Sequence, residues 1–212
     1  MHTSLALLLE RFPVLAPMQA DLEAAGAMLL DAAQEKKLIL IAGNGGSSAD
    51  AEHIVGELMK SFVLPRPLDA KLQARLKELG GEEGVYIGEH LQQGVGAVCL
   101  SSHTALTSAF ANDVDSSLSY AQQIVGYGSE GGVFWGISTS GNAKNVAQAA
   151  LVAKAMGMQV LGLTGSSGGK LKELADVCLR VPESETYMVQ ELHLPIYHWL
   201  CIYVEEMLFG GP

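Results

Sequence analysis

The stretch LILIAGNGGSSADAEHIVGELMK, residues 38–60, decides the fold. An apolar run at 38–41 is followed by the glycine-rich turn GNGG at 43–46, and serines then open a helix. Glycines let the backbone approach a bound group, and the N–H groups and positive dipole end of a helix N-terminus favour an anion such as phosphate. The dinucleotide fingerprint fails because Ser48 replaces its third glycine, and no Gly-Lys-Ser/Thr follows to make a P-loop. On these residues alone, an anion site and a plain strand-to-helix turn are equal alternatives.

The size and composition of the chain indicate a globular protein with a large apolar core. It has 212 residues, of which 49% are hydrophobic and 17% are charged. Chains of roughly 100 to 250 residues commonly form one domain. No apolar run reaches the ~18 residues that span a bilayer, and the N-terminal segment is interrupted by Glu10 and Arg11. We therefore expect one domain, residues 1–212, that is soluble, cytoplasmic and not bound to membranes.

The charge and the cysteines narrow the possible partners. A net charge of −10 argues against nucleic-acid binding, which needs a basic surface, but it does not exclude a phosphorylated metabolite held at a helix N-terminus. Cys99, Cys178 and Cys201 are odd in number, widely spaced and set in apolar runs. Buried thiols are therefore expected in place of a disulfide framework or a cysteine zinc site.

Strand and helix patterns alternate along the chain. Residues 3–36 predict helices broken near Pro13 and Pro17, which would pack on the sheet or on another subunit. The predicted strands are 38–41, 97–100, 132–137, 160–163 and 177–181, and the helices between and after them include 104–110, 117–127, 143–156, 171–175 and 185–209. This order predicts an α/β fold, a three-layer α/β/α sandwich with about five parallel strands and a ligand site at their carboxyl ends.

Residues 65–97 interrupt this alternation. Leu68, Leu72, Leu76 and Leu79 have helical spacing, and two glycines follow them. The pattern predicts an amphipathic helix, a glycine turn and a second short helix. The alternatives for this insertion are a solvated surface excursion, a flap over the site, or an added subunit contact.

Three strands are followed by turns rich in glycine and hydroxyl side chains: GNGGSS, STSGN and TGSSGG. The first two run directly into a helix N-terminus and are the better phosphate candidates, whereas the third may serve only as a connection. Serine and threonine are also ordinary helix caps, so one such loop means little. Two at equivalent ends of one sheet favour an anion site.

A second group of polar residues lies on two helices. His53 and Glu57 are four apart and share one helix face, a spacing that suits two ligands of one metal. In the last helix, the segment QELHLPIYH carries Gln190 and His198, which are eight apart and so within about 80° of each other around a regular helix. The proline between them should kink the helix or start it afresh. A single helical histidine is usually structural, and only the joint pattern indicates a site.

Together these segments resemble a sugar isomerase (SIS) domain. The resemblance rests on GNGGSSADAEH with Glu57, GISTSGN at 136–142, LTGSSGGKLKELAD at 163–176 and QELHLPIYH. It covers most of the chain except the insertion at 65–97. Within this group the segments are similar to the phosphoheptose isomerase family, whose members convert sedoheptulose 7-phosphate to D-glycero-D-manno-heptose 7-phosphate. The resemblance implies an aldose–ketose isomerase that works through an enediol, in a homotetramer with sites at subunit interfaces.

The resemblance also implies the roles of individual residues. One zinc ion per subunit is expected, with its ligands at His53, Glu57, Gln190 and His198. Retention of all four favours an enzyme over the SIS-type initiator-associating protein of chromosome replication, which lacks a full ligand set. Glu57 is the expected base at carbon and His198 the general acid, although both are also expected ligands. The expected substrate-binding residues are Asn44, Gly45, Gly46, Ser47, Asp113, Ser138, Thr139, Ser140, Asn142 and Gln190.

Several positions depart from the family pattern. Ala143 replaces a further phosphate-binding serine, Ser61 replaces an arginine, and Tyr187 replaces a sugar-binding aspartate. These departures put the sugar in doubt more than the reaction. Two alternatives therefore stay open: a non-catalytic phosphosugar-binding or protein-interaction module, and an isomerase of a pentose or hexose phosphate.

Overall fold

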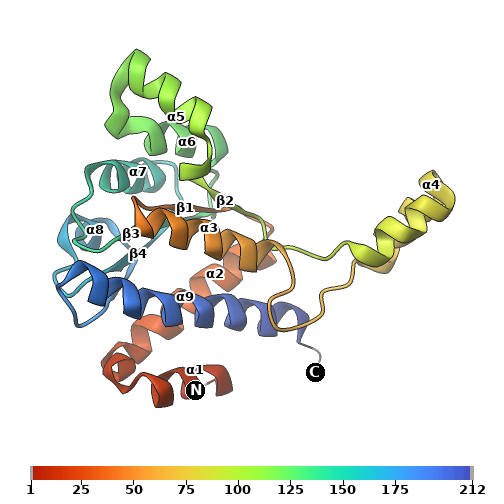
Figure 1. The fold of residues 1–212 in the computed structure, drawn as a ribbon, viewed down its shortest axis with the longest axis horizontal. Coiled ribbons are helices and arrows are strands. Elements are labelled where there is room, and N and C mark those ends of the chain that lie inside the picture. The colour runs from red at the N-terminus through yellow and green to blue at the C-terminus, as the bar shows by residue number, and fades with distance from the viewer. Residues whose placement is uncertain (1, 211–212) are drawn as a thin grey trace.

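The centre of the protein is a five-stranded parallel sheet with helices on both faces (Figure 1). The computed structural model describes residues 2–210. The strand order is β2-β1-β3-β4-β5, and the bounds are β1 Ile39–Ala42, β2 Ala97–Cys99, β3 Val133–Ser138, β4 Gln159–Thr164 and β5 Val177–Arg180. Because β2 and β3 flank β1 on opposite sides, the chain changes direction between β1 and β3. Open α/β sheets bind ligands at such a switch point.

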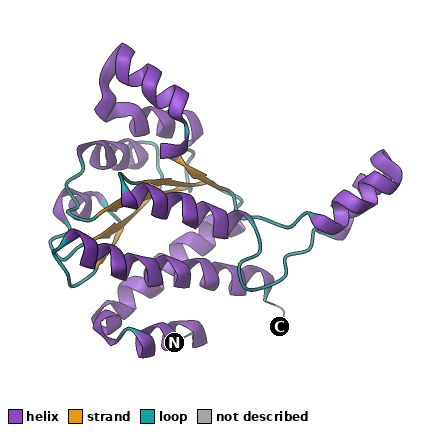
Figure 2. Cartoon of the chain, viewed as in Figure 1, coloured by secondary structure: helices purple, strands orange, loops and turns teal. Residues whose placement is uncertain are grey.

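Two helical layers complete the sandwich (Figure 2). One layer holds α2 (Gln19–Gln34), α3 (Gly46–Met59) and α9 (Thr186–Phe209), and the other holds α6 (Ser119–Tyr127), α7 (Lys144–Ala155) and α8 (Gly169–Leu174). α1 (Thr3–Arg11) lies outside α9 and joins α2 through a 3-10 turn, Pro13–Met18. α5 (Thr104–Phe110) packs beside α6. The expected three-layer architecture is confirmed.

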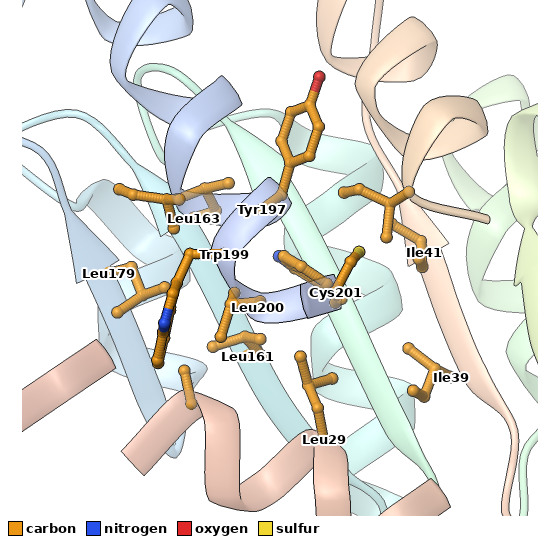
Figure 3. Packing of buried hydrophobic residues seen from close by; sticks show 14 of the residues in the cluster. Leu29, Ile39, Ile41, Leu161, Leu163, Leu179, Tyr197, Trp199, Leu200 and Cys201 are labelled. Carbon is orange, nitrogen blue, oxygen red and sulfur yellow. The ribbon is translucent and has the colours of Figure 1, made fainter. Parts of the chain in front are cut away.

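Alternate residues of each central strand serve the two layers. Ile39 and Ile41 join the core cluster under α2, α3 and α9, whereas Leu40 and Ala42 join the cluster under α6 and α7. All four are fully buried, which explains the continuous apolar run of β1. Figure 3 shows the first cluster, in which residues of α9 and α2 pack on strand residues such as Leu161.

α9 differs from its prediction at the proline. It runs unbroken from Thr186 to Phe209 with Pro195 inside, so the expected fresh start at this residue is wrong. A proline removes one backbone hydrogen bond and crowds the preceding turn. Here Val189 before it and Ile196 after it are both fully buried in the same core cluster. Packing against one sheet therefore holds the two halves in one helix.

The insertion forms a helical hairpin, α4 (Ala70–His90), which we call the arm. Its two helices meet at Gly81, whose φ of 55° only glycine adopts readily. They pack so closely that a Cβ at Gly84 would lie 1.9 Å from the Leu76 carbonyl oxygen. The predicted helix, glycine turn and helix are confirmed. The arm projects away from the sheet (Figure 1), so it does not form a flap over the strand ends.

Two smaller expectations can also be compared with the structure. Cys99 and Cys201 are buried and Cys178 is half-buried, and all three are free thiols. Among residues 2–210, no helix combines the length and apolarity that crossing a bilayer requires.

Candidate active site

The first two hydroxyl-rich loops meet at the switch point. The side-chain amides of Asn44, after β1, and Asn145, in the first turn of α7, exchange two hydrogen bonds of 2.9 Å each. The Tyr120 hydroxyl of α6 donates to the Gly43 carbonyl oxygen at 2.8 Å. These contacts fix the GNGG turn beside the loop after β3. Asn145 and Tyr120 were not predicted from the sequence, because neither lies in one of the glycine-rich motifs.

The turn at 43–46 also brings Gln190 to this edge of the sheet. Gly45 has a φ of 56°, and a Cβ at Gly46 would lie 2.6 Å from Gln190 Nε2. The amide of Gln190, on α9, therefore lies against the first residue of α3. A larger side chain at position 46 would displace that amide.

The predicted hydroxyl donors lie at the starts of two helices, Ser47 in the first turn of α3 and Ser138, Thr139 and Ser140 in the loop before α7. Ser47 and Ser138 are buried, Thr139 is partly buried and Ser140 is exposed. Ser138 Oγ accepts a weak hydrogen bond from the Ala143 N–H at 3.4 Å, and Ser140 Oγ accepts one from the Asn142 N–H at 3.2 Å. Because α3 and α7 both begin at this edge, two positive helix ends and several hydroxyls are available to one anion.

The predicted acid–base residues lie side by side where α3 packs on α9. His53 Nε2 is 3.1 Å from Glu57 Oε1, and the ring centroids of His53 and His198 are 5.0 Å apart. Lys60 Nζ donates to Glu57 Oε2 at 2.9 Å. Thus Lys60 pairs with one oxygen of Glu57, His53 approaches the other, and His198 faces His53 from the neighbouring helix.

A hydrogen-bonded chain sets the orientation of the His53 ring. The Tyr197 hydroxyl lies 3.3 Å from Asp50 Oδ1 and 3.1 Å from His53 Nδ1. It points away from the core cluster (Figure 3). Burial and then the Asp50 charge raise the pKa of Tyr197, which keeps it a neutral phenol. The hydroxyl can hold the ring in either tautomer: it donates to Asp50 and accepts from Nδ1–H, which leaves the lone pair on Nε2, or it donates to Nδ1, which leaves Nε2–H to donate to Glu57.

The tautomer of His53 bears on metal binding. With the lone pair on His53 Nε2, this nitrogen and Glu57 Oε1 are two donor atoms 3.1 Å apart that a proton or a metal cation can bridge. His198 Nε2 is buried and has no hydrogen-bond partner within residues 2–210. In the same part of the chain, no three His, Cys, Asp or Glu side chains already have metal-site spacing. Nitrogen and oxygen donors of this kind nevertheless fit zinc.

His198 is neutral near pH 7. Burial lowers its pKa, the neighbouring His53 lowers it further, and Glu57 opposes them. A neutral imidazole keeps one lone pair for a cation or a proton and one N–H for a substrate oxygen. Both uses remain open in this geometry.

Comparisons with known proteins identify the family. Models of the SIS domain match residues 6–80 and 94–198. A phosphoheptose isomerase of Aneurinibacillus thermoaerophilus is 35% identical over 188 residues, which cover 89% of this chain and 82% of that protein. The chain belongs to the phosphoheptose isomerase family of SIS domains. Phosphoheptose isomerase 2 of Campylobacter jejuni is 38% identical over 171 residues, 81% of this chain and 72% of that protein.

Solved structures of this family share the fold. The phosphoheptose isomerase from Neisseria gonorrhoeae superposes with a TM-score of 0.72 at 28% identity, covering 96% of this chain and 93% of that one. The one from Francisella tularensis gives a TM-score of 0.75 at 24% identity, covering 97% and 100%. The SIS fold that the sequence resemblance implied is therefore confirmed.

Not every family position reaches this cleft. Asp113 lies in an exposed π-helical turn, Ala111–Asp115, where it accepts a hydrogen bond from Asn112 at 2.9 Å. No hydrogen bond described for residues 2–210 joins it to the loops at the switch point. Tyr187 is 59% exposed on the first turn of α9. Ser61 contributes to the base of the arm, because its Oγ accepts from the Arg66 N–H at 3.1 Å.

A buried ion pair next to this SIS-domain cleft was not predicted. Arg66 Nε donates to Glu205 Oε1 at 2.6 Å, and both side chains are 0% exposed. The Arg66 guanidinium also donates to the carbonyl oxygens of Glu57 and Leu58. It therefore closes the C-terminal end of α3, the helix that carries Glu57.

Glu205 is fully satisfied in this pair. Its oxygens accept from the backbone N–H groups of Phe62, Val63 and Leu64 as well as from Arg66. Burial alone would raise its pKa, but these backbone bonds and the guanidinium outweigh burial and lower the pKa of Glu205. The carboxylate therefore stays ionised inside the protein.

An apolar groove of about 860 Å³ runs between α1 and α9 and reaches the cleft. His198 borders it, together with Leu7, Phe12, Phe62, Leu194 and Trp199. Leu7 is 54% exposed and Leu194 is 42% exposed. His198 therefore lies at one border of this groove as well as beside His53.

Proposed function

We propose that the chain is an aldose–ketose isomerase that converts sedoheptulose 7-phosphate to D-glycero-D-manno-heptose 7-phosphate through an enediol. The observation that carries this proposal is the position of His53 and Glu57 opposite His198, beside two phosphate-type loops at the β1–β3 switch point. The relative from Aneurinibacillus thermoaerophilus, named phosphoheptose isomerase, supports this substrate.

The two loops would hold the phosphorylated end of the sugar. The N-termini of α3 and α7 and the hydroxyls of Ser47, Ser138, Thr139 and Ser140 supply donors for the phosphate oxygens. Asn44, Gly45, Gly46, Asn142 and Gln190 lie next to these loops and are the proposed contacts to the sugar. A contact between Asp113 and the sugar requires the turn at 111–115 to move toward these loops.

The reaction moves one proton between carbons and one between oxygens. In the direction of aldose formation, Glu57 takes the proton from C1 and returns it to C2 on the same face of the cis-enediol. Neutral His198 donates its N–H to one sugar oxygen and receives the proton of the other. Each well-placed acid or base contributes roughly 10²- to 10⁴-fold to the rate. Glu57 must exchange its contacts to His53 and Lys60 for the substrate proton.

We further propose one zinc ion per subunit, held by His53, Glu57, Gln190 and His198. A zinc ion held by these residues would act as a Lewis acid and stabilise negative charge on the enediolate. The close approach of His53 Nε2 to Glu57 Oε1 and the unpartnered His198 Nε2 support this donor set. A homotetramer whose neighbouring subunit completes the site is also proposed, and the groove that ends at His198 supports it.

The substrate is tested with purified protein, loaded with zinc or stripped by a chelator. Sedoheptulose 7-phosphate, fructose 6-phosphate and ribulose 5-phosphate are supplied separately, and aldose formation is followed by NMR. We expect turnover of the heptose phosphate only with zinc, and slower turnover of the others. Turnover of only a pentose or hexose phosphate would change the substrate. Phosphosugar binding without turnover of any of them would favour a non-catalytic module.

A further inference from the structure

The arm, residues 70–90, carries large apolar side chains that the rest of the chain leaves uncovered. Leu72 is 44% exposed, Leu79 is 70% exposed and Tyr86 is 57% exposed. Leu72 and Leu79 are seven residues apart, so they lie on one face of the first arm helix. The arm projects from the body (Figure 1), so the sheet and its covering helices do not shield these residues.

The two helices of the arm have opposite charge. The first, 70–80, carries Lys71, Arg75 and Lys77 against a single acid, Glu78. The second, 82–90, has no lysine or arginine and carries the acids Glu82, Glu83 and Glu89. All of these side chains belong to exposed residues.

These charges are not neutralised between the two helices. The one arm ion pair in the described part of the chain, Arg75 with Glu78 at 2.7 Å, lies within the first helix. The protein as a whole has a net charge of −10, with 13 basic and 23 acidic residues, so copies of it generally repel each other. The arm is an exception to this repulsion. Because one of its helices is basic and the other acidic, the arm of one copy is complementary in charge to the arm of another.

From this charge pattern we propose that the arm docks on the arm of a second copy of this chain. In a two-fold arrangement, the basic helix of each copy faces the acidic helix of the other, and the same contact occurs twice. Leu72 and Leu79, which share one face of the first arm helix, then lie against the arm of the partner, with charged residues at the edges of the contact. The occupant of this surface is thus a second copy of the chain.

Backbone and side-chain hydrogen bonds fix the base of the arm to the rest of the chain. An antiparallel bridge joins Pro67 to Gln92, and the Gln92 side chain accepts from the Ser61 N–H at 2.8 Å. Arg66, next to the bridge, is fixed by Glu205 of α9. A surface that is ordered before contact loses less entropy on association. This inference does not depend on the proposed reaction, because no arm residue belongs to the cleft.

Charge reversal tests the proposal on the full chain. One variant carries Lys71→Glu, Arg75→Glu and Lys77→Glu, and a second carries Glu82→Lys, Glu83→Lys and Glu89→Lys. Each makes both arm helices alike in charge. Sedimentation velocity over a concentration series should show the midpoint of self-association raised by roughly tenfold or more in either variant. An equal mixture of the two should recover the wild-type midpoint, because opposite helices then meet across the interface.

Two controls keep the result decisive. Lys36→Glu, Lys170→Glu and Lys172→Glu change the net charge as much as the first variant, at exposed positions outside the arm, and should leave the midpoint near wild type. Replacing 69–91 by a short Gly-Ser linker should weaken association as the reversals do, whether or not a reversed arm folds. Wild-type association in both reversed variants and in the linker variant would overturn the proposal. So would a mixture that fails to recover.

Discussion

Two polar clusters on the α3–α9 pair differ in how completely their hydrogen bonds are made. At the C-terminal end of α9, Glu205 and Arg66 are 0% exposed, and both side chains are paired. Nearer its start, His198 Nε2 has no partner within residues 2–210, and His53 Nε2 lies 3.1 Å from Glu57 Oε1. Both clusters lie between the same two helices.

We infer from this difference that the complete cluster stabilises the fold and that the incomplete cluster is the one proposed to react. Buried polar groups are normally satisfied, and a complete network fixes the chain in one arrangement. Groups that keep a free lone pair or a shared oxygen can still bind a cation or exchange a proton, at a cost to stability that the surrounding fold must offset. The complete cluster also holds the end of α3, and therefore supports Glu57 in the incomplete one.

Glu57→Gln should give the largest loss of turnover with almost no change in the free energy of unfolding. The amide keeps the size of the side chain but cannot accept the carbon-bound proton. Turnover at saturating zinc should fall by roughly 10²- to 10⁴-fold. The free energy of unfolding in urea should change by less than about 1 kcal/mol, because Glu57 is not part of the apolar core.

Glu52→Gln is the matched control, since Glu52 is an exposed carboxylate on the same helix. It should keep wild-type turnover. Equal turnover in Glu57→Gln and wild type would remove Glu57 from the reaction and end the comparison between the two clusters.

Arg66→Met should lower the stability of the protein and leave the proposed reacting residues in place. It leaves the ionised Glu205 buried without its guanidinium partner, and breaking a buried pair in this way costs about 3–5 kcal/mol. Urea denaturation measures the loss. Arg75→Met removes an exposed arginine of the arm and should cost no more than about 0.5 kcal/mol. A loss below about 1 kcal/mol in Arg66→Met would show that the complete cluster does not stabilise the fold.

His193 is a third buried polar residue of α9, and it makes the stability of the protein depend on pH. It is fully buried, and burial lowers its pKa to about 4 from 6.5 against a smaller opposing effect of the Thr164 backbone. Below pH 6.5 the unfolded chain takes up a proton that the folded chain excludes, so stability falls until about pH 4. The loss from this residue approaches about 3 kcal/mol at pH 4.

In His193→Leu this part of the decline should disappear. The difference in unfolding free energy between wild type and variant, measured in urea at several pH values from 7.5 to 4, should shift in favour of the variant as the pH falls. His90→Leu, at an exposed position, should follow the wild type. Parallel curves for His193→Leu and wild type would contradict the buried neutral state of His193.

Tyr197→Phe should have the smallest of these effects. It removes the hydroxyl between Asp50 and His53 and with it the bond that orients the His53 ring. Loss of such a supporting contact lowers metal affinity by roughly 10- to 100-fold. Competition with a chromophoric chelator measures zinc retention, and Tyr203→Phe, which changes a tyrosine outside the cleft on the same helix, is the control. Unchanged retention in Tyr197→Phe would exclude the hydroxyl as a support for a ligand.

The local sequence predicts much of the fold and part of the site. The glycine turn, the five strands and the spacing of His53 and Glu57 are short-range signals, and the structure contains these elements where they were expected. The Arg66–Glu205 pair joins residues 139 positions apart, so no local pattern could reveal it. The fresh start considered at Pro195 is absent because long-range packing holds α9 in one helix. The zinc set and the substrate contacts remain predictions.

The incorporation of deuterium tests the central claim most directly. Sedoheptulose 7-phosphate is incubated with zinc-loaded protein in D₂O, and NMR follows deuterium at C1 and C2 together with the appearance of aldose signals. Wild type and Arg66→Met, at a temperature where both are folded, should exchange and isomerise, whereas Glu57→Gln should do neither. Exchange in Glu57→Gln at the wild-type rate, or none in the zinc-loaded wild type, would contradict the assignment of the incomplete cluster to catalysis.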